Sequence, residues 1–425
     1  MALFQLKTIL LDTGERLPLL IERATGIPLF EPTVFTVSQL RARNLATNTI
    51  IQAMRAIVVL HTMLAKNDID LNRRLDEGQI LSQGEIDELV GMAKKELASF
   101  TDLGKEEDRR DQPRKVLSLE QARLSLTRNQ APNEVNSDTT AIRLLYIREY
   151  LNWRIDERLL RTTTSHKHRA TLAELKVIVD EAISQRTPIS RGRCHQEERL
   201  GLDGDERALL LEITDLQHPD NPWSSSHAKE RNALIVRLGL GLGLRRGELL
   251  GLRIQDISAL HEEVFVARRP DDKTDPRLDQ PNAKTRERTI VLTSSLAEQI
   301  RTYVQGLRRE QGDARKHPFL LVASGTGKPL SISGFNKIFR PLQQASPQLR
   351  HVISHLLRHT FNDDMSDELE AAGESGPAVW KSLLRLNGWS ETSQMPARYT
   401  KRSTARKANA AHRTLQEKLI GKEQS

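Results

Sequence analysis

Apolar residues recur every three or four positions along most of the chain from residue 37, which is the spacing of one face of an α-helix. Three such stripes, at 47–63, 79–97 and 139–160, predict the helices of a small domain that we place at 33–160. Its aromatic residues share their stripe with aliphatic ones. We therefore interpret them as core residues rather than as surfaces on which bases stack.

Before this domain the pattern changes to the short spacing of β-strands. A turn sequence at 12–15 lies between two apolar runs and predicts a β-hairpin at 4–21. We assign 1–32 to this N-terminal β-hairpin arm, and prefer an edge ribbon packed on the next domain to a DNA-binding arm. After the helical domain, a polar and basic stretch at 161–170 predicts a linker, which either follows a phosphate backbone or is merely solvated.

The remaining residues, 171–425, predict a second domain that is mainly helical with a small β-sheet. Apolar runs at 264–267 and 288–292 predict two strands joined by a long polar loop, and 319–322 predicts a strand or a buried turn. Helical spacing recurs at 171–183, 205–217, 227–240, 296–307, 333–345, 355–368, 377–387 and 404–419. Glycines at 241 and 243 predict the end of the third of these helices.

Composition narrows the class of protein. The chain has 425 residues, which suits two or three domains, and a net charge of +8. That excess favours a polyanion such as nucleic acid as partner, with a basic but otherwise ordinary enzyme as the alternative. The single cysteine, Cys194, excludes an internal disulfide framework and a cysteine-based zinc site. We find no apolar run long enough to span a membrane and no signal peptide, so we expect a cytoplasmic protein.

Two arginines are candidates for binding a phosphodiester. A guanidinium meets two phosphate oxygens with a planar fork and stays protonated, and Arg245 and Arg358 each lie beside an apolar helical run. Taken singly, each is better explained as a surface or ion-pair residue. Glu248 follows Arg245 by one helical turn and could hold its guanidinium or simply pair on a helix face.

Two further side chains accompany the second arginine. His355 precedes Arg358 by one helical turn, so both can face one phosphate, and an imidazole can transfer a proton near neutral pH. His359 is a competitor that faces about 100 degrees away. Trp389 follows a pair typical of a helix C-terminus, and its indole N–H can donate to a phosphate oxygen; a core tryptophan is the alternative.

A nucleophile and an acid complete the candidates. Tyr399 lies among basic residues and is the last of four tyrosines in the chain. A phenol has a pKa of about 10 and attacks poorly unless cations lower that barrier. Lys284 opens the second strand of the sheet, from which a flexible ammonium could protonate a leaving oxygen. Lys273 in the preceding loop is a rival, and we prefer Lys284 because the strand follows it directly.

In this order the motifs resemble the tyrosine recombinase (phage integrase) family. The resemblance rests on the segment 243–252, Lys284 followed by Arg288, the box 355–361, Gly388-Trp389 and Arg398-Tyr399-Thr400. It implies a helical core-binding (SAM-like) domain at 33–160 and an α+β tyrosine-recombinase catalytic domain at 171–425. Four features depart from the family. Tryptophan replaces the usual histidine at 389, the loop 269–283 is long, the spacing from Arg358 to Trp389 suggests an insertion near 368–377, and the hairpin at 4–21 has no clear family counterpart.

The resemblance also implies a reaction. Tyr399 would attack the scissile phosphate and form a 3′-phosphotyrosyl link, with Arg245 and Arg358 stabilising the charge, Lys284 as general acid, His355 assisting proton transfer and Trp389 supporting the phosphate. Neither a metal nor a cofactor is implied. The implied partners are double-stranded DNA, four protomers in one synapse and other recombinases of the same mobile element, at the nucleoid. A catalytically idle or accessory DNA-binding member and a type IB topoisomerase remain alternatives.

Overall fold

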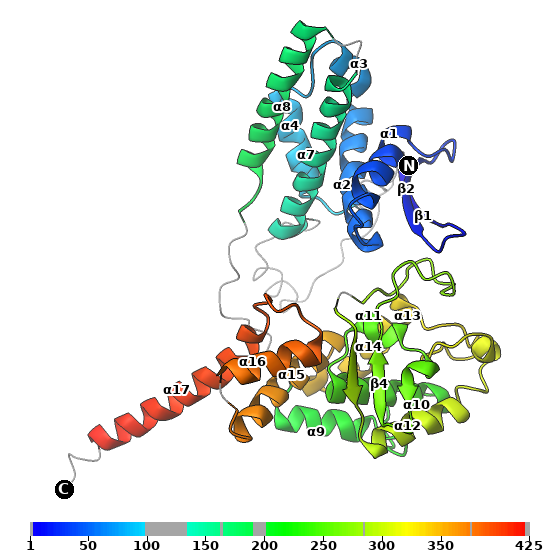
Figure 1. Cartoon of the computed structure of the whole chain (residues 1–425), viewed down its shortest axis with the longest axis vertical. Helices are drawn as coiled ribbons and strands as arrows, with labels where there is room; N and C mark the ends of the chain where they lie inside the picture. Colours follow the sequence, from blue (N-terminus) through cyan, green and yellow to red (C-terminus); the bar gives the residue numbers. More distant parts are fainter. Residues whose placement is uncertain are drawn as a thin grey trace, which may run out of the picture. The chain divides into compact units, whose positions relative to one another are not determined.

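The computed structural model describes residues 3–97, 134–161, 165–189, 201–283, 285–374 and 376–420; within the last range, the side chains at 398–407, 410 and 420 are not described. The chain divides into two compact units, Met1–Cys194 and His195–Ser425. Figure 1 shows the first unit as a group of helices with a β-hairpin, and the second as helices around a short sheet. Helices dominate both units, as expected.

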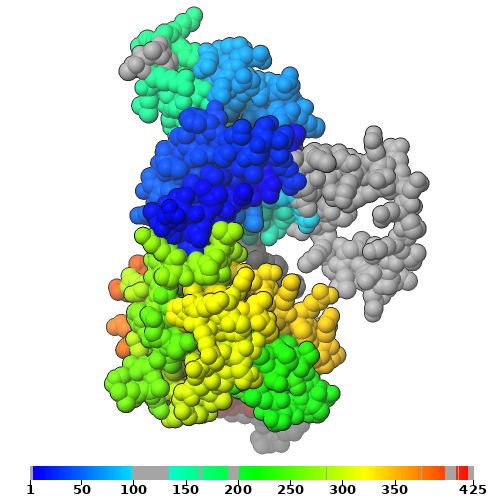
Figure 2. Space-filling view, turned by 90° about the vertical axis from the view of Figure 1, so that its right-hand side faces the viewer, coloured from blue at the N-terminus to red at the C-terminus, as the bar shows by residue number. Residues whose placement is uncertain are grey.

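The N-terminal hairpin is present and is packed on helices. Strand β1 (Phe4–Leu10) pairs antiparallel with β2 (Arg16–Glu22), so that Leu6 lies opposite Leu20. Leu20 is fully buried and joins the helical core, while Phe4 and Leu6 pack against that core. In Figure 2 the surface of the hairpin and of the first helices is continuous (dark blue). The structure therefore agrees with a ribbon that packs on the adjoining helices.

The core of the first unit surrounds one long helix. The helical elements are α1 (Phe30–Phe35), the π-helical turn η1 (Thr36–Arg41), α2 (Thr47–Lys66), α3 (Leu71–Asp76), α4 (Gln83–Ala93), α7 (Ser137–Leu159) and α8 (His166–Arg186). By length and apolar composition alone, α2 could cross a membrane, although the sequence predicts no apolar run of that length. Its apolar residues, Ile50, Met54, Ile57 and Leu60 among them, lie instead in the core of the unit.

Helix α8 corrects the expected domain boundary. We placed a linker at 161–170 and the second domain from 171, but the chain is helical from His166 and the units divide after residue 194. Leu172, Val179 and Ile183 are fully buried in the core of the first unit. Their spacing puts them on one face of a helix, which packs beside α7. From His166 onward, the basic stretch is thus the start of a core helix.

The second unit places a three-stranded antiparallel sheet among helices. Strands β3 (Ile257–Ser258), β4 (Glu263–Val266) and β5 (Arg288–Val291) lie in that order, with Val264 opposite Ile290. The helices are α9 (Gly204–Ile213), α10 (Ser226–Leu242), α11 (Arg246–Gly251), α12 (Ser294–Gln305), α13 (Ile332–Lys337), α14 (Phe339–Ala345), α15 (Ser354–Ala371), α16 (Gly376–Asn387) and α17 (Pro396–Ile420), with 3-10 turns η4 (Ile254–Asp256), η5 (Gly312–Lys316) and η6 (Pro347–Leu349).

In this unit the structure decides between two local alternatives and moves the start of the last helix. The run 319–322 is buried but forms no full strand; it makes only single bridges, from Phe319 to Arg253 and from Val322 to Pro329. The sequence left a strand and a buried turn as alternatives here, and the structure agrees with the buried turn. The last helix begins at Pro396 rather than at 404, so residue 399 falls within its first turn. The proline suits that position because the first helical residue donates no intrahelical hydrogen bond.

Candidate active site

The first candidate arginine follows a helix end that admits only glycine. Helix α10 ends at Gly243, whose φ of +59° is left-handed, and a Cβ there would lie 2.2 Å from Cδ1 of Phe361. The carbonyl oxygen of Gly243 accepts a hydrogen bond from Nη1 of Arg358 at 2.5 Å. Arg245 follows two residues later, directly before α11. The end of α10 thus brings the two expected phosphate-binding arginines into one region.

Both arginines also reach the same carbonyl oxygen. Nη1 of Arg245 lies 3.5 Å and Nη2 of Arg358 lies 3.4 Å from the carbonyl oxygen of Asn387, the last residue of α16. Carbonyls at a helix C-terminus carry partial negative charge, which attracts cations. The amide of Asn387 donates in turn to Oδ1 of Asn362, whose own amide donates to the carbonyl of Arg358 at 2.7 Å. Side-chain hydrogen bonds therefore connect α15 to the end of α16.

Trp389 is both a core residue and a neighbour of Arg358. Its side chain is 8% exposed and packs with Val379, Leu383 and Leu384 of α16. The guanidinium of Arg358 lies 5.4 Å from the centre of the indole ring, within the range of a cation–π contact. The two interpretations offered by the sequence are therefore compatible, since the same indole fills a small core and adjoins the buried arginine.

Glu248 is a buried carboxylate beside the arginines of the candidate site. It is 2% exposed, and its Oε2 accepts from the backbone N–H of Arg245 at 2.9 Å. Its closest side-chain partners are Arg288, with Nη1 at 3.1 Å and Nη2 at 2.9 Å, and the hydroxyl of Thr285. Burial works to raise the pKa of Glu248, but the bonds from Arg288, the charge of Arg358 and the Thr285 hydroxyl outweigh it, and the pKa lies below its usual value.

The guanidinium of Arg245 lies farther from this carboxylate, with Nη1 at 3.6 Å from Oε1 of Glu248. Arg288 is therefore the close partner that the sequence did not suggest for Glu248. A signal was present: residues 288 and 290 alternate with exposed positions in β5, so an arginine takes an inward position next to a buried isoleucine. Buried arginines are rare unless paired, which would have pointed to a carboxylate nearby.

The histidine and the remaining candidates are placed as follows. His355 is exposed in the first turn of α15, and its ring lies 4.4 Å, centre to centre, from the ring of buried His359. Lys284 lies outside the described residues. The helical course of α17 includes Tyr399, but its side chain is not described. Arg245, Arg358 and Trp389 are thus brought together, while the positions of the acid and the nucleophile remain expectations.

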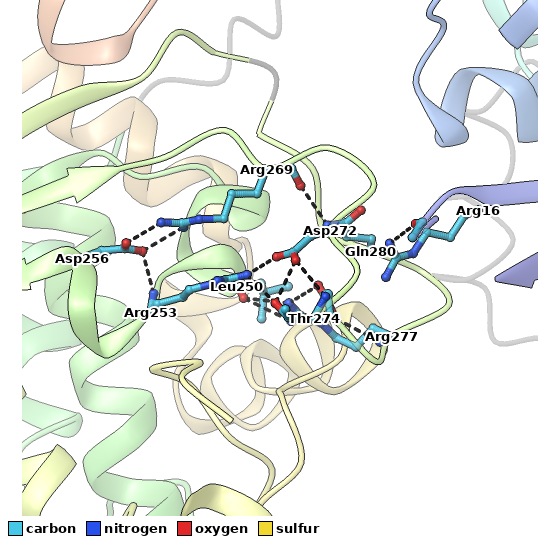
Figure 3. A network of polar contacts seen from close by, with 11 residues as sticks. Arg16, Leu250, Arg253, Asp256, Arg269, Asp272, Thr274, Arg277 and Gln280 are labelled. Carbon is cyan, nitrogen blue, oxygen red and sulfur yellow. Dashed lines mark hydrogen bonds and ion pairs between the residues drawn. The ribbon is translucent and has the colours of Figure 1, made fainter. Parts of the chain in front are cut away.

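The long loop between β4 and β5 is tied to the body of the unit by ion pairs (Figure 3). Arg269 binds both oxygens of Asp256 at 3.0 and 2.5 Å, and Arg253 pairs with Asp272. Asp272 also accepts from the backbone N–H and the hydroxyl of Thr274 at 2.9 and 2.8 Å. Lys273, the alternative to Lys284 as general acid, lies between Asp272 and Thr274 in the sequence and is exposed.

A second set of contacts holds the loop farther along. Arg277 meets Oδ1 and Oδ2 of Asp275 at 2.8 Å each and donates to the carbonyls of Leu250 and Leu330 at 3.1 and 2.8 Å. Its guanidinium lies 4.6 Å from the ring centre of Phe319. The loop that precedes Lys284 is therefore anchored at several points to α11 and to the buried segment around Phe319.

Comparison with known proteins identifies the family. Residues 205–405 match the phage integrase family, and this region contains Arg245, Arg358, Trp389 and Tyr399. This part of the chain is therefore a domain of the tyrosine recombinase (phage integrase) family, as the motifs indicated. The match places residues 205–405 among the tyrosine-type DNA recombinases.

Two similar proteins are themselves named tyrosine recombinases. Tyrosine recombinase XerC of Bacillus subtilis (strain 168) is 24% identical over 225 residues, covering 52% of this chain and 67% of the relative. Tyrosine recombinase XerC of Vibrio cholerae (strain O395) is 28% identical over 176 residues, covering 41% of this chain and 48% of the relative. The matched regions thus span about two thirds of the first relative and about half of the second.

Solved structures overlap more loosely. XerH site-specific recombinase bound to palindromic difH substrate has a TM-score of 0.43 at 13% identity, covering 85% of this chain and 96% of that one. The Tn1549 transposon integrase in complex with transposon right end DNA has a TM-score of 0.35 at 15% identity, covering 71% of this chain and 98% of that one. Likeness of this degree adds nothing to the family assignment.

Proposed function

We propose that the protein is a site-specific DNA recombinase that cleaves and rejoins strands through a 3′-phosphotyrosyl intermediate. The observation that carries the proposal is the convergence of Arg245 and Arg358 on the carbonyl oxygen of Asn387, beside Trp389. A non-bridging phosphate oxygen is a stronger acceptor than this carbonyl. Two guanidiniums already directed at one acceptor are suited to receive it.

The arginines and the tryptophan would bind the scissile phosphate. Cleavage adds negative charge to the non-bridging oxygens, and the fixed forks of Arg245 and Arg358 would stabilise that charge in a site partly shielded from water. The indole N–H of Trp389 would donate to a phosphate oxygen without exchanging a proton. Since none of these groups titrates near neutral pH, proton transfer falls to other residues.

The bond-making step uses Tyr399. Its phenolic oxygen attacks phosphorus, the bond from phosphorus to the 5′ oxygen breaks, and the electron pair leaves with that oxygen. His355 accepts the phenolic proton, and Lys284 protonates the departing 5′ oxygen. The phosphotyrosyl link retains the bond energy for rejoining, so the proposed reaction requires neither ATP nor a metal ion.

The proposed partners are double-stranded DNA, further copies of the chain in a tetrameric synapse, and other recombinases of the same mobile element. The net charge of +8 favours a polyanion. Leu415 and Leu419 of α17 are 54% and 64% exposed, which would suit docking on a neighbouring protomer. A recombinase acting on cellular DNA would work in the cytoplasm, at the nucleoid.

A covalent-adduct assay tests the proposal. We would incubate the full chain with a nicked duplex taken from the flanks of its genetic element, then look for a protein–DNA adduct on a denaturing gel. We expect an adduct with wild type and none with Tyr399→Phe. Tyr146→Phe is the matched control, because Tyr146 lies half-buried in the first unit, and should leave the adduct intact.

Each other outcome has a definite meaning. DNA binding by wild type without an adduct would overturn the cleavage proposal in favour of an idle or accessory DNA-binding protein. An adduct that persists in Tyr399→Phe would show that another residue is the nucleophile.

A further inference from the structure

Arg288 is a buried arginine that the proposed chemistry does not use. It is the first residue of β5, and 6% of its side chain is exposed. Its Nε donates to the carbonyl of Leu386 at 2.6 Å, while Nη1 and Nη2 donate to the two oxygens of Glu248 at 3.1 and 2.9 Å. One guanidinium thus joins the start of a strand, the end of α16 and the carboxylate next to Arg245.

Three arginines surround that single carboxylate at different distances. Arg288 holds both oxygens of Glu248 closely, whereas Nη1 of Arg245 lies at 3.6 Å and Nη1 of Arg358 at 3.8 Å. A carboxylate this deeply buried is costly without a close cation. If Arg288 were removed, the buried charge of Glu248 would be stabilised most by a shift of Arg245 or Arg358 toward it. Both guanidiniums lie less than an ångström beyond hydrogen-bonding distance.

The same residue fixes the end of α16. Consecutive carbonyls there accept from different donors: Leu386 from Arg288, Asn387 from Arg245 and Arg358, and Gly388 from the backbone N–H of residue 286 at 2.9 Å. The position of the Asn387 carbonyl, on which the two outer arginines converge, therefore depends on how the start of β5 holds this helix end. A shift of either element would move both arginines.

We propose that Arg288 is a positioning residue of the candidate active site. By occupying both oxygens of Glu248 and the carbonyl of Leu386, it keeps the guanidiniums of Arg245 and Arg358 directed at a bound phosphodiester instead of at Glu248. This inference rests on the proposed strand-cleavage function. It assigns Arg288 no contact with DNA, so its effect should appear in the cleavage step and not in binding.

The test compares Arg288→Met, Glu248→Gln and the double variant in single-turnover cleavage of the nicked duplex at saturating protein. We expect Arg288→Met to slow cleavage about a hundredfold, comparable with the loss of one oriented donor to a transition state, with DNA affinity changed less than about threefold. The double variant should recover at least about tenfold over Arg288→Met, because no charged carboxylate remains to draw the other arginines away.

That recovery separates positioning from mere structural support. If Arg288 only stabilised the fold, removing Glu248 as well would leave cleavage as slow as in Arg288→Met or slower, and the inference would be wrong. Arg288→Lys keeps the charge but cannot span both oxygens and the Leu386 carbonyl, so its rate should fall between wild type and Arg288→Met. If Arg288→Met fails to fold, the comparison of Arg288→Lys with Arg288→Lys/Glu248→Gln decides the same question.

A second substrate tells which catalytic group is affected. Sulfur in place of the leaving 5′ oxygen departs as a thiolate and needs no acid, so it bypasses Lys284. We expect the Arg288→Met defect to persist with this substrate; full rescue would mean that Arg288 acts through the lysine and would overturn the inference. Arg301→Met removes an exposed arginine paired on α12 and serves as control.

The proposed function and this inference fail in different ways. Wild type without any adduct overturns both. Wild type that cleaves, with Arg288→Met cleaving equally fast, overturns the role of Arg288 alone.

Discussion

Gly388 follows the end of α16 and lies close to the segment that leads into β5. Its φ is +62°, and a Cβ would lie 2.6 Å from the carbonyl oxygen of Arg286 and 3.1 Å from Nη1 of Arg288. Glycine is therefore required twice over, for the left-handed backbone and for the close approach. The neighbouring carbonyls of α16 accept from the arginines of the site, so any displacement here reaches them directly.

We expect Gly388→Ala to lower the free energy of unfolding by about 2 to 4 kcal/mol, from left-handed strain plus the backbone contact, and to slow strand cleavage. Gly325→Ala is the matched control, because Gly325 has a φ of +77° but a Cβ there would meet nothing within 4 Å. Only the strain of about 1 kcal/mol should appear there. Urea unfolding measures both; equal losses would show that the close approach at Gly388 is of no consequence.

At the scale of single residues, the sequence predicted which residues lie in the candidate site better than it predicted which of them bind one another. The ordered motifs indicated Arg245, Arg358 and Trp389, and these do lie together. The sequence could not show that Glu248 binds Arg288 most closely, since several cations compete for one carboxylate and tertiary position decides among them. The roles of Lys284, His355 and Tyr399 remain predictions.

At the scale of elements, the loop between β4 and β5 depends on charge for its shape. The side chain of Asp272 is 13% exposed and pairs with Arg253. Burial works to raise its pKa, but the hydrogen bonds from Thr274 and the charge and hydrogen bond of Arg253 outweigh it, so the pKa is lowered. A carboxyl whose folded pKa is depressed contributes stability above its unfolded pKa, which is about 3.9, and loses it as the pH falls through the folded value.

We therefore expect Asp272→Asn to destabilise the second unit by about 1 to 3 kcal/mol at pH 7, with the difference from wild type shrinking as the pH falls below about 4. Unfolding by urea at a series of pH values measures this difference. Asp279→Asn, which changes an exposed carboxylate of the same loop, should have little effect at any pH. A difference at Asp272 that stays constant into acid would exclude the ionised carboxylate as its cause.

The spacing of apolar residues predicted that these helices exist, but it predicted where they begin much less well. Helix α8 was expected from 171 and begins at His166, and α17 was expected from 404 and begins at Pro396. In both cases the first turns are polar and basic, so they carry no apolar signal. What marks the start of α8 instead is its N-cap, Ser165, whose hydroxyl accepts from the backbone N–H of His168.

At the scale of the whole molecule, each unit has its own hydrophobic core. Among the described residues, one large buried cluster runs from Leu20 to Ile183 within the first unit, and another from Leu202 to Leu357 within the second. The sequence predicted two such domains from a change in pattern, yet placed their boundary too early, because the burial of one face of α8 depends on packing against α7. Separate cores predict separate cooperative unfolding.

Leu60 and Leu238 test this independence, since each is fully buried in a different core. Leu60→Ala should cost about 2 to 5 kcal/mol and lower one of two calorimetric transitions by about 5 to 15 °C, leaving the other in place. Leu238→Ala should lower the other transition instead. If either variant moved both transitions together, the two cores would unfold as one cooperative unit. DNA should raise both midpoints if both units bind it, because a ligand stabilises whatever folded part it contacts.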